Sequence, residues 1–272
     1  MLNATGTFPE VFTKSACSQQ NFINILQAEF LRLFYKGAVK ILAILLAVSA
    51  VIFIGLTISS FDIMEGSLGQ VNVANQYLSL LYVVIGIYIV CSVSREHEDK
   101  TTLASLMAVP DRTKLFIARI TAWTLLAIAT GALGYIVGFV ALVPFQSKLV
   151  GSVVLSELAA GFGLSLVKCA FTGILCFSIA TIFRRVGLGL LVYLVLELIG
   201  AMLIGMVAPM MPETIANIFA EVNKALPNSL MTALTASGEE ASKEMPRVAI
   251  TIVAWAVVSV GASFAVFQKV KK

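Results

Sequence analysis

Residues 116–144 read FIARITAWTLLAIATGALGYIVGFVALVP, a run in which Arg119 is the only charged residue. A membrane-crossing α-helix needs about 20 consecutive, mainly apolar residues. Inside lipid every backbone N–H and C=O must be bonded within the protein, which restricts spanning segments to helices and closed β-barrels. The run lacks the alternation of polar and apolar residues that marks a barrel strand. It is therefore predicted to be a transmembrane helix.

Five further apolar stretches surround this one, and the whole chain shares its composition. Hydrophobic residues make up 59% of the 272 residues and charged residues 12%, against roughly 25% charged in soluble domains. A soluble fold would leave large apolar patches exposed, which soluble monomers rarely do. Six spans are expected, at residues 38–58, 77–93, 116–144, 150–183, 186–207 and 248–267. The predicted fold is an all-α integral membrane protein, with a six-helix domain (38–272) after an N-terminal segment (1–37).

Basic residues are concentrated on one side of this topology. Fourteen Lys and Arg residues lie in the N-terminal segment, the second-to-third connection through Arg119, the fourth-to-fifth connection and the C-terminal tail, against four in the opposite connections. Cytoplasmic loops carry the excess of Lys and Arg. Both termini are therefore predicted to be cytoplasmic, in a multi-pass protein of the cell membrane. The net charge of +4 follows from this topology, and no nucleic-acid partner is needed to explain it.

Residues 19–36 form an amphipathic pattern ahead of the first span. Apolar residues recur at helical spacing, and polar residues lie largely opposite them. The apolar set is Phe22, Ile25, Leu26, Phe30, Leu33 and Phe34, and the polar set is Gln20, Asn24, Gln27 and Glu29. Gly37 offers a bend, so the segment is predicted to be an elbow helix on the cytoplasmic membrane surface. The alternative is a cytoplasmic extension of the first span.

The cytoplasmic connection at residues 94–114 is predicted to contain a short helix at residues 100–109. Acidic residues precede its N-terminus, where negative charge complements the helix dipole; they are Glu96, Glu98 and Asp99. Pro110 ends this helix, and Asp111 is placed to cap the next one. Three apolar residues share one side of it: Leu103, Leu106 and Met107. This stripe suits either a surface helix resting on lipid headgroups or a docking helix for a cytoplasmic partner.

The same stretch resembles the signature of ATP-binding-cassette type-2 permeases. The resemblance is carried by Glu98, Asp99, Lys100, Thr101, Thr102, Leu103, Leu106, Met107, Pro110, Arg112 and Arg119. In that family an acidic residue precedes a Gly-Thr pair, a Leu-rich turn, a Pro and a basic residue that enters the third span. Thr101 stands where the family usually has Gly, and Arg119 stands where it often has Lys. The six spans, the elbow and the orientation extend the resemblance over nearly the whole chain.

The resemblance implies that this connection is a coupling helix that docks on a separate nucleotide-binding subunit. The implied contact residues are Glu98, Asp99, Thr102, Leu103, Leu106, Met107, Pro110 and Arg112. It also implies a homodimer, or a heterodimer with a related permease, bound to two cytoplasmic ATPase subunits. The chain has no Gly-x-x-x-x-Gly-Lys-Ser/Thr phosphate loop. ATP and Mg²⁺ are therefore expected on the partner ATPase, and no cofactor is expected on this chain.

The outer connection between the fifth and sixth spans is predicted to contain two short helices. A helical stripe follows Pro212 and continues from Ile215 to Leu226, and a second helix fits residues 230–236 after a break at Pro227. Both are too short to cross a bilayer, which favours re-entrant or interfacial helices. Similar permeases have such helices at the outer end of the transport pathway.

Three charged residues fall within the predicted spans: Glu157 and Lys168 in the fourth and Glu197 in the fifth. Each is costly against lipid, so each is expected to face protein or water. Lys168 and Glu197 come to similar depth, and a contact between them is our hypothesis; a structural pair and a substrate or ion contact are the two roles considered.

No cluster of nucleophile, base or metal ligands is found, so the chain is not expected to be an enzyme. The leading hypothesis is the membrane subunit of an ATP-driven exporter. Two alternatives stay open. One is a stand-alone secondary transporter that uses Glu157, Lys168 and Glu197 as a relay, and the other is a non-transporting membrane scaffold or sensor.

Overall fold

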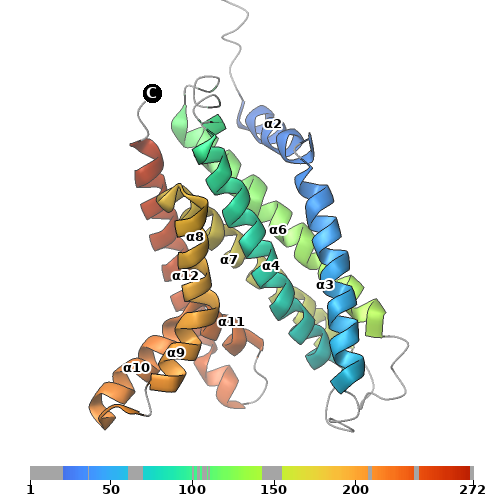
Figure 1. The fold of residues 1–272 in the computed structure, drawn as a ribbon, viewed down its shortest axis with the longest axis vertical. Coiled ribbons are helices and arrows are strands. Elements are labelled where there is room, and N and C mark those ends of the chain that lie inside the picture. The colour runs from blue at the N-terminus through green and yellow to red at the C-terminus, as the bar shows by residue number, and fades with distance from the viewer. Residues whose placement is uncertain are drawn as a thin grey trace, which may run out of the picture.

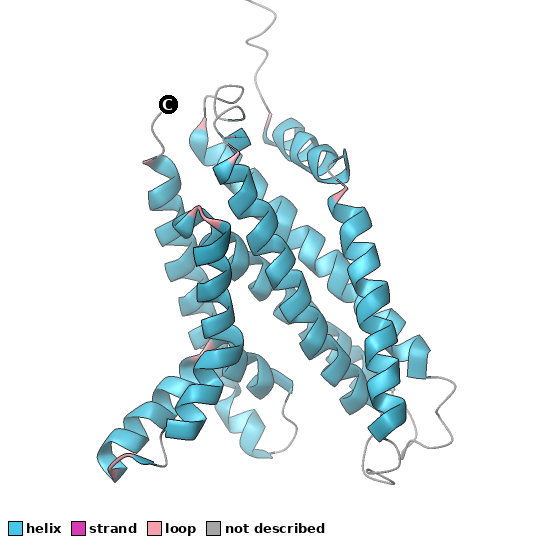
Figure 2. Cartoon of the chain, in the orientation of Figure 1, coloured by secondary structure: helices cyan, strands magenta, loops and turns pink. Residues whose placement is uncertain are grey.

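A computed structural model describes residues 21–35, 37–60, 70–99, 101–102, 105, 109, 111–142, 155–207, 210–235 and 239–269. Over these residues the chain forms helices joined by turns, without a strand (Figure 2). The helices are α2 (Phe22–Tyr35), α3 (Ala38–Ser60), α4 (Gln70–Glu98), α6 (Arg112–Leu142), α7 (Leu155–Phe183), α8 (Val186–Leu194), the π-helix η2 (Val195–Ile199), α9 (Gly200–Val207), α10 (Glu213–Ala225), α11 (Pro227–Thr235) and α12 (Glu239–Gln268). The predicted all-α class is confirmed for this part of the chain.

Four helical segments of the described residues are long and apolar enough to cross a membrane. They are Leu80–Glu98, Arg112–Val140, Ala159–Phe183 and Met245–Gln268. They correspond to the second, third, fourth and sixth predicted spans, and they give the chain the character of a membrane protein. The helices α2 and α3 pass the same test only as a pair, bent by 57°. The total of six spans remains a prediction.

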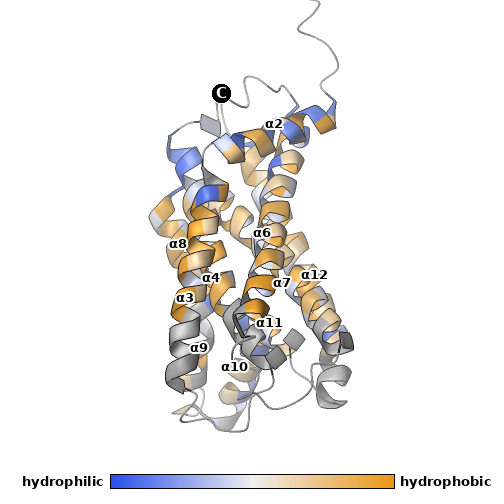
Figure 3. Ribbon diagram, turned by 90° about the vertical axis from the view of Figure 1, so that its right-hand side faces the viewer, coloured by the Kyte–Doolittle hydropathy of each residue, from blue (hydrophilic) through white to orange (hydrophobic). Residues whose placement is uncertain are grey.

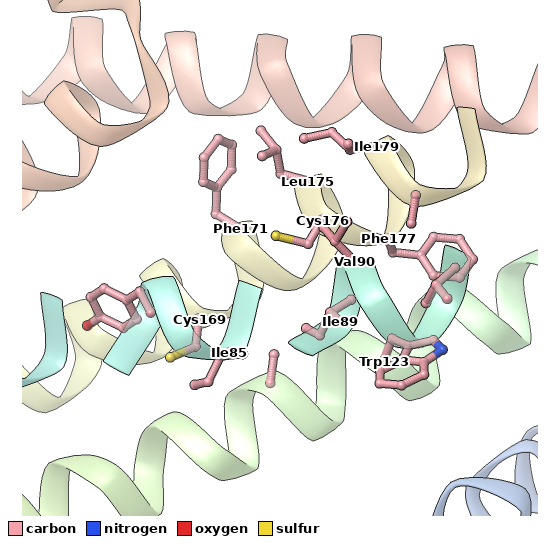
Figure 4. Packing of buried hydrophobic residues seen from close by; sticks show 14 of the residues in the cluster. Ile85, Ile89, Val90, Trp123, Cys169, Phe171, Leu175, Cys176, Phe177 and Ile179 are labelled. Atoms are coloured by element: carbon pink, nitrogen blue, oxygen red, sulfur yellow. The ribbon is translucent and has the colours of Figure 1, made fainter. Parts of the chain in front are cut away.

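The bundle is built around α7, which packs against α4, α6 and α12. Within the bundle 67% of the α7 span is buried, against 11% of the α12 span. Figure 4 shows Phe171, Leu175 and Ile179 pointing from α7 toward α12, whereas Cys169 points toward the side of α4 and α6. Apolar side chains thus fill the interior and also cover the outside of α12, as expected where the solvent is hydrocarbon.

Phe116 joins three helices where α6 begins and α12 ends. Its ring centroid lies 5.8 Å from that of Phe177 on α7, and 5.3 Å and 5.4 Å from those of Phe264 and Phe267 on α12. The planes are inclined by 55° to 64°, which is the edge-to-face arrangement that aromatic quadrupoles favour. These contacts fix the spacing of α6, α7 and α12 at this end.

A bend separates α2 from α3 at Gly37. The φ angle of Gly37 is +73°, a left-handed conformation that residues with a Cβ rarely adopt. Figure 1 shows α2 lying across one end of the bundle, whereas α3 runs from there along the length of the bundle. The predicted bend is therefore present, whereas the position of α2 on a membrane surface remains a prediction.

The predicted fifth span is not a single regular helix. From Val186 to Val207 the chain is helical throughout, which matches the predicted bounds, but the residues of η2 form a π-helix. The apolar helix in this region, Val186–Glu197, is too short to cross a membrane by itself. Wider π-helical turns of this kind are rare and frequently occur at functional sites. Here the turn contains Glu197, one of the predicted intramembrane charges.

The helices α10 and α11 lie at the end of the bundle opposite α2 (Figure 1). They are the two short helices predicted between the fifth and sixth spans, and their existence is confirmed. The indole Nε1 of Trp255 on α12 donates a hydrogen bond of 2.8 Å to the backbone O of Ala225, which holds the end of α10 against α12. Their re-entrant placement in a membrane stays a prediction.

The basic segments predicted to share one side lie at one end of the bundle. Arg32 of α2 contacts Glu96 at the end of α4, and Arg112 and Arg184 both contact the end of α12. Figure 3 shows hydrophilic residues gathered at this end and hydrophobic residues over the middle of the bundle. The fold thus reproduces the predicted grouping, and the compartment that this end faces remains a prediction.

Gly131→Ala is expected to lower the thermal unfolding midpoint of the protein in detergent. The helices α6 and α7 approach so closely that a Cβ on residue 131 would collide with the Sγ of Cys169. Overpacking of this kind costs about 1–3 kcal/mol. Adding Cys169→Ala should recover part of the loss, because it removes the collision with Sγ and leaves a Cβ 3.1 Å from the new methyl group, which is still a close contact.

Gly163→Ala on α7 is the matched control, since a Cβ there meets nothing within 4 Å. A double variant no more stable than Gly131→Ala alone would contradict this packing.

Candidate functional site at the α2 end of the bundle

The side chain of Arg119 lies buried at the point where four elements meet. Arg119 stands two turns into α6, and only 3% of it is exposed. Around it are α2, the end of α4 and the connection that links α4 to α6. An unpaired charge in such a place costs several kcal/mol, so its partners determine whether the arrangement is stable.

Arg119 is paired on every side that the structure describes. Its Nε lies 3.2 Å from Oε1 of Glu29, and its Nη1 lies 4.0 Å from Oε2 of Glu96. The same Nη1 donates a hydrogen bond of 3.2 Å to the hydroxyl of Thr102, and Nη2 donates one of 2.8 Å to the hydroxyl of Ser105. The planar guanidinium thus uses its fork of donors on three elements at once.

A second arginine completes the charge balance. The Nη2 of Arg32 lies 2.7 Å from Oε2 of Glu29 and 3.0 Å from Oε2 of Glu96. Two guanidinium groups therefore face two carboxylates, and the formal charge of the four sums to zero. We call Glu29, Arg32, Glu96 and Arg119 the charge cluster. It joins α2, α4 and α6 through side chains alone.

The start of the connection is folded back onto the end of α4. The hydroxyls of Thr101 and Thr102 donate to the backbone O of Glu96 over 3.1 Å and 3.2 Å. The hydroxyl of Ser105 donates to the backbone O of Thr101 over 3.2 Å. The last carbonyl groups of a helix lack partners within it, so these hydroxyls satisfy an orphan acceptor. The hydroxyl oxygens of Thr102 and Ser105 in turn accept from Arg119.

Asp111 caps α6, as its position before the third span predicted. Its Oδ1 accepts hydrogen bonds from the backbone N–H of Thr113 at 3.1 Å and of Lys114 at 3.2 Å. The N–H of Lys114 contributes most to holding the pKa of the Asp111 carboxyl below its usual value, with the Lys114 ammonium adding to it. The connection is thus fixed at its far end as well as at its start.

Residues flanking the connection bond to the ends of two other helices. The Oε1 of Glu98 accepts from the backbone N–H of Val186 at 2.9 Å, at the N-terminus of α8. The Nη1 of Arg112 donates to the backbone O of Gln268 over 2.7 Å, at the C-terminus of α12. An anion at a helix N-terminus and a cation at a C-terminus both complement the helix dipole.

Arg184 makes a second bond to the same helix end. It lies in the turn between α7 and α8 with a φ angle of +54°, and its Nη2 donates to the backbone O of Val266 over 2.7 Å. The end of α12 is therefore held by two arginines, one from the start of α6 and one from the turn between α7 and α8.

The predicted contact residues divide into three groups. Leu103, Leu106, Met107 and Pro110 lie outside the described residues. Asp99 is exposed in the turn after α4. Thr102 is buried, and Glu98 and Arg112 form the bonds within the chain given above. In this structure Thr102, Glu98 and Arg112 anchor the connection, and a contact with a partner remains a prediction for all eight.

Of the three predicted intramembrane charges, Lys168 lies on α7 and Glu197 on η2. Lys168 and Glu197 are both buried and influence each other electrostatically, yet no ion pair within 4.0 Å joins these two described residues. The Nζ of Lys168 lies 5.6 Å from the ring centroid of Tyr82, within the range of a cation–π contact. Position 157 belongs to α7, and the side chain of Glu157 lies outside the description.

Sequence reasoning missed the charge cluster. The amphipathic pattern assigned Glu29 to the polar face of its helix, but Glu29 is buried against the bundle. One signal was present: Arg119 is the only charge in residues 116–144, and a lone cation in a span requires an acidic partner. Nothing in the spacing identified that partner, because Glu29 is ninety residues away along the chain.

No protein family model matches this chain, and no curated protein matches it. Among the described residues no three His, Cys, Asp or Glu side chains are grouped so that they could hold a metal ion.

Arg119→Met is expected to destabilise the protein strongly, by about 3–5 kcal/mol, because it leaves two buried carboxylates with one guanidinium. Thermal unfolding in detergent, followed by circular dichroism, measures the change. Lys114→Met is the matched control, because Lys114 is 51% exposed and its pair with Asp111 lies at the surface, where such pairs contribute about 0–1 kcal/mol. Equal midpoints for the two variants would contradict a structural role for the cluster.

Proposed function

We propose that this chain is the membrane-spanning permease subunit of an ATP-driven exporter, whose ATPase is a separate cytoplasmic chain. Its composition and its four apolar helices are those of a membrane protein. The signature residues from Glu98 to Arg119 resemble those of ATP-binding-cassette type-2 permeases. Substrate would cross or leave the membrane at the interface of a permease dimer, and no residue of this chain would perform covalent chemistry.

The observation that carries this proposal is the way the connection is built into the bundle. Thr101, Thr102 and Ser105 bind it to Glu96 and Arg119, and Asp111 fixes its far end. A flexible loop would absorb a push from a partner. A connection held by a buried charge cluster transmits that push, because the cluster cannot be separated without exposing paired charges to an apolar interior.

The proposed mechanism follows from the elements that the connection contacts. ATP binding would draw two ATPase subunits together and displace the 100–109 segment. The charge cluster would pass that displacement to α2, α4 and α6. The bonds of Glu98 to α8 and of Arg112 to α12 would pass it to the remaining helices of the bundle.

The proposal includes the finer topology. The chain would cross the cell membrane six times with both termini in the cytoplasm, and α2 would lie as an elbow in the inner headgroup region. The short helices α10 and α11 would be re-entrant or interfacial at the outer surface. The end that carries α2 bears most of the basic residues, which supports its assignment to the cytoplasm.

Leu103→Asp combined with Leu106→Asp is expected to abolish co-purification of the ATPase subunits with the tagged permease. Two carboxylates in an apolar docking stripe leave charges buried without a partner in the complex. The measurement is the ratio of ATPase to permease after affinity purification from the native membrane, expected to be one to one for a dimer with two ATPases.

Lys269→Asp is the matched control, because it changes the charge by the same two units at the same end of the bundle, outside the connection, and should leave the ratio unchanged. Native permease that purifies without an ATPase under these conditions would contradict the proposal.

The same preparation tests the secondary-transporter alternative. The observation that favours this alternative is the burial of Lys168 and Glu197, with Glu197 in a π-helical turn. Transport by the purified chain alone, driven by an ion gradient and lost in Glu197→Gln, would support it over the exporter. If neither an ATPase partner nor gradient-driven transport is found, the scaffold remains.

A further inference from the structure

A small cavity lies between α10, α11 and α12, at the end of the bundle opposite α2. Its volume is about 90 Å³, which is several times what one water molecule needs, about 10–15 Å³. Two cationic side chains line it, Lys224 from α10 and Arg247 from α12, together with the hydroxyl residues Ser229 and Thr251. A small anionic group in this cavity would therefore be close to one cation from α10 and one from α12.

Among the described side chains at this cavity, the positive charge exceeds the negative charge. One carboxylate, that of Glu221, serves both cations: its Oε1 lies 3.0 Å from the Nζ of Lys224, and its Oε2 pairs with Nη2 of Arg247. The side chains of these three residues are about half exposed. Exposed ion pairs contribute only about 0–1 kcal/mol. An anionic ligand can therefore replace Glu221 as the partner of these cations at a small cost in free energy. When no ligand is bound, the two cations and Glu221 carry one unit of net positive charge.

The two hydroxyl groups add a preference for hydrogen-bond donors in the ligand. Thr251 donates its hydroxyl hydrogen to the backbone O of Arg247 over 2.8 Å, and Ser229 donates to Oδ1 of Asn223 over 3.4 Å. The hydroxyl hydrogen of Thr251 is used, so its oxygen is left to accept, and the oxygen of Ser229 can also accept. The cavity therefore suits a phosphate bound by the cations, carried by a group that has hydroxyl hydrogens of its own.

An apolar groove continues from the cavity along α10. It is open, has a volume of about 490 Å³ and shares Ala225 with the cavity. Ile218 and Val222 line it, with 60% and 47% of their surfaces exposed. A charged cavity joined to an apolar groove matches an amphipathic molecule, with a phosphate in the first and a hydrocarbon chain along the second.

We propose that α10, α11 and α12 form a binding site for an anionic phospholipid with a hydroxyl-bearing headgroup, of which phosphatidylglycerol is the simplest. Lys224 and Arg247 bind the phosphate, the oxygens of Ser229 and Thr251 accept from the headgroup hydroxyls, and an acyl chain covers Ile218 and Val222. The site does not involve the ATPase partner.

Native mass spectrometry of the purified full chain, titrated with phosphatidylglycerol in detergent, tests the proposal. The double variant Lys224→Gln/Arg247→Gln is expected to bind this lipid about tenfold more weakly than wild type, the effect of about 1.4 kcal/mol. Lys114→Gln is the control: it removes an equally exposed cation, paired three residues away in the same manner, at the opposite end. Equal affinities for all three proteins would overturn the proposal.

The variant Glu221→Gln distinguishes two roles for Lys224 and Arg247: binding a ligand, and holding α10 and α12 together through their ion pairs with Glu221. It frees both cations, so the proposal expects tighter phosphatidylglycerol binding, whereas a purely structural role predicts a lower unfolding midpoint and no gain in affinity. A loss of affinity in Glu221→Gln, with the fold intact by circular dichroism, would overturn the proposal.

The nature of the ligand is tested with two further probes. Phosphatidylcholine lacks both headgroup hydroxyls and net charge, and it should bind about tenfold more weakly than phosphatidylglycerol. Glycerophosphoglycerol, the deacylated form of phosphatidylglycerol, carries the same phosphodiester and headgroup hydroxyls without the chains. If it binds as tightly as the lipid, the apolar groove plays no part, and the assignment to a lipid is wrong.

Discussion

A guanidinium inside an apolar bundle must be neutralised, and this requirement on Arg119 organises the end of the molecule that carries α2. Desolvation of a charge costs far more than a helix packing contact contributes, so Arg119 is compatible with its position only while Glu29 and Glu96 are there. Those carboxylates belong to α2 and α4. The ion pairs thereby hold α2, α4 and α6 in one arrangement. The hydroxyls of Thr102 and Ser105 bind the connection to the same arginine.

The remaining helices at this end are held through their backbones instead of through buried charges. Glu98 binds the first N–H of α8, and Arg112 and Arg184 bind the last carbonyls of α12. These are bonds to helix termini, where the groups lack partners within the helix and the dipole favours the observed charge. Glu96, Glu98 and Arg112 each make one of these contacts. The stretch 96–112 is therefore linked to α2, α6, α8 and α12.

Four of the predicted spans correspond to helices long and apolar enough to cross a membrane, and α6 and α7 begin and end within six residues of the predictions. These helices were predictable because the requirement for a long apolar run is local in the sequence. The cap at Asp111 and the bend at Gly37 were equally local. The burial of Glu29 was not, since its partner is ninety residues away and the helical pattern of α2 alone suits a solvated carboxylate. The π-helix at η2 was also hidden, because a change of helical period over five residues leaves no mark on an apolar composition.

The two ends of the bundle use charge differently, and α12 connects them. In the charge cluster at the α2 end the charges are largely buried and share partners, so replacing any of them is costly. At the other end Glu221, Lys224 and Arg247 are half exposed and exchange cheaply. The helix α12 is bonded at one end to Arg112 and Arg184, and toward the other its Trp255 and Arg247 reach α10. Although only 11% of its span is buried, bonds of α12 thus connect the two ends of the bundle, through Arg112 and Arg184 at the α2 end and through α10 at the other.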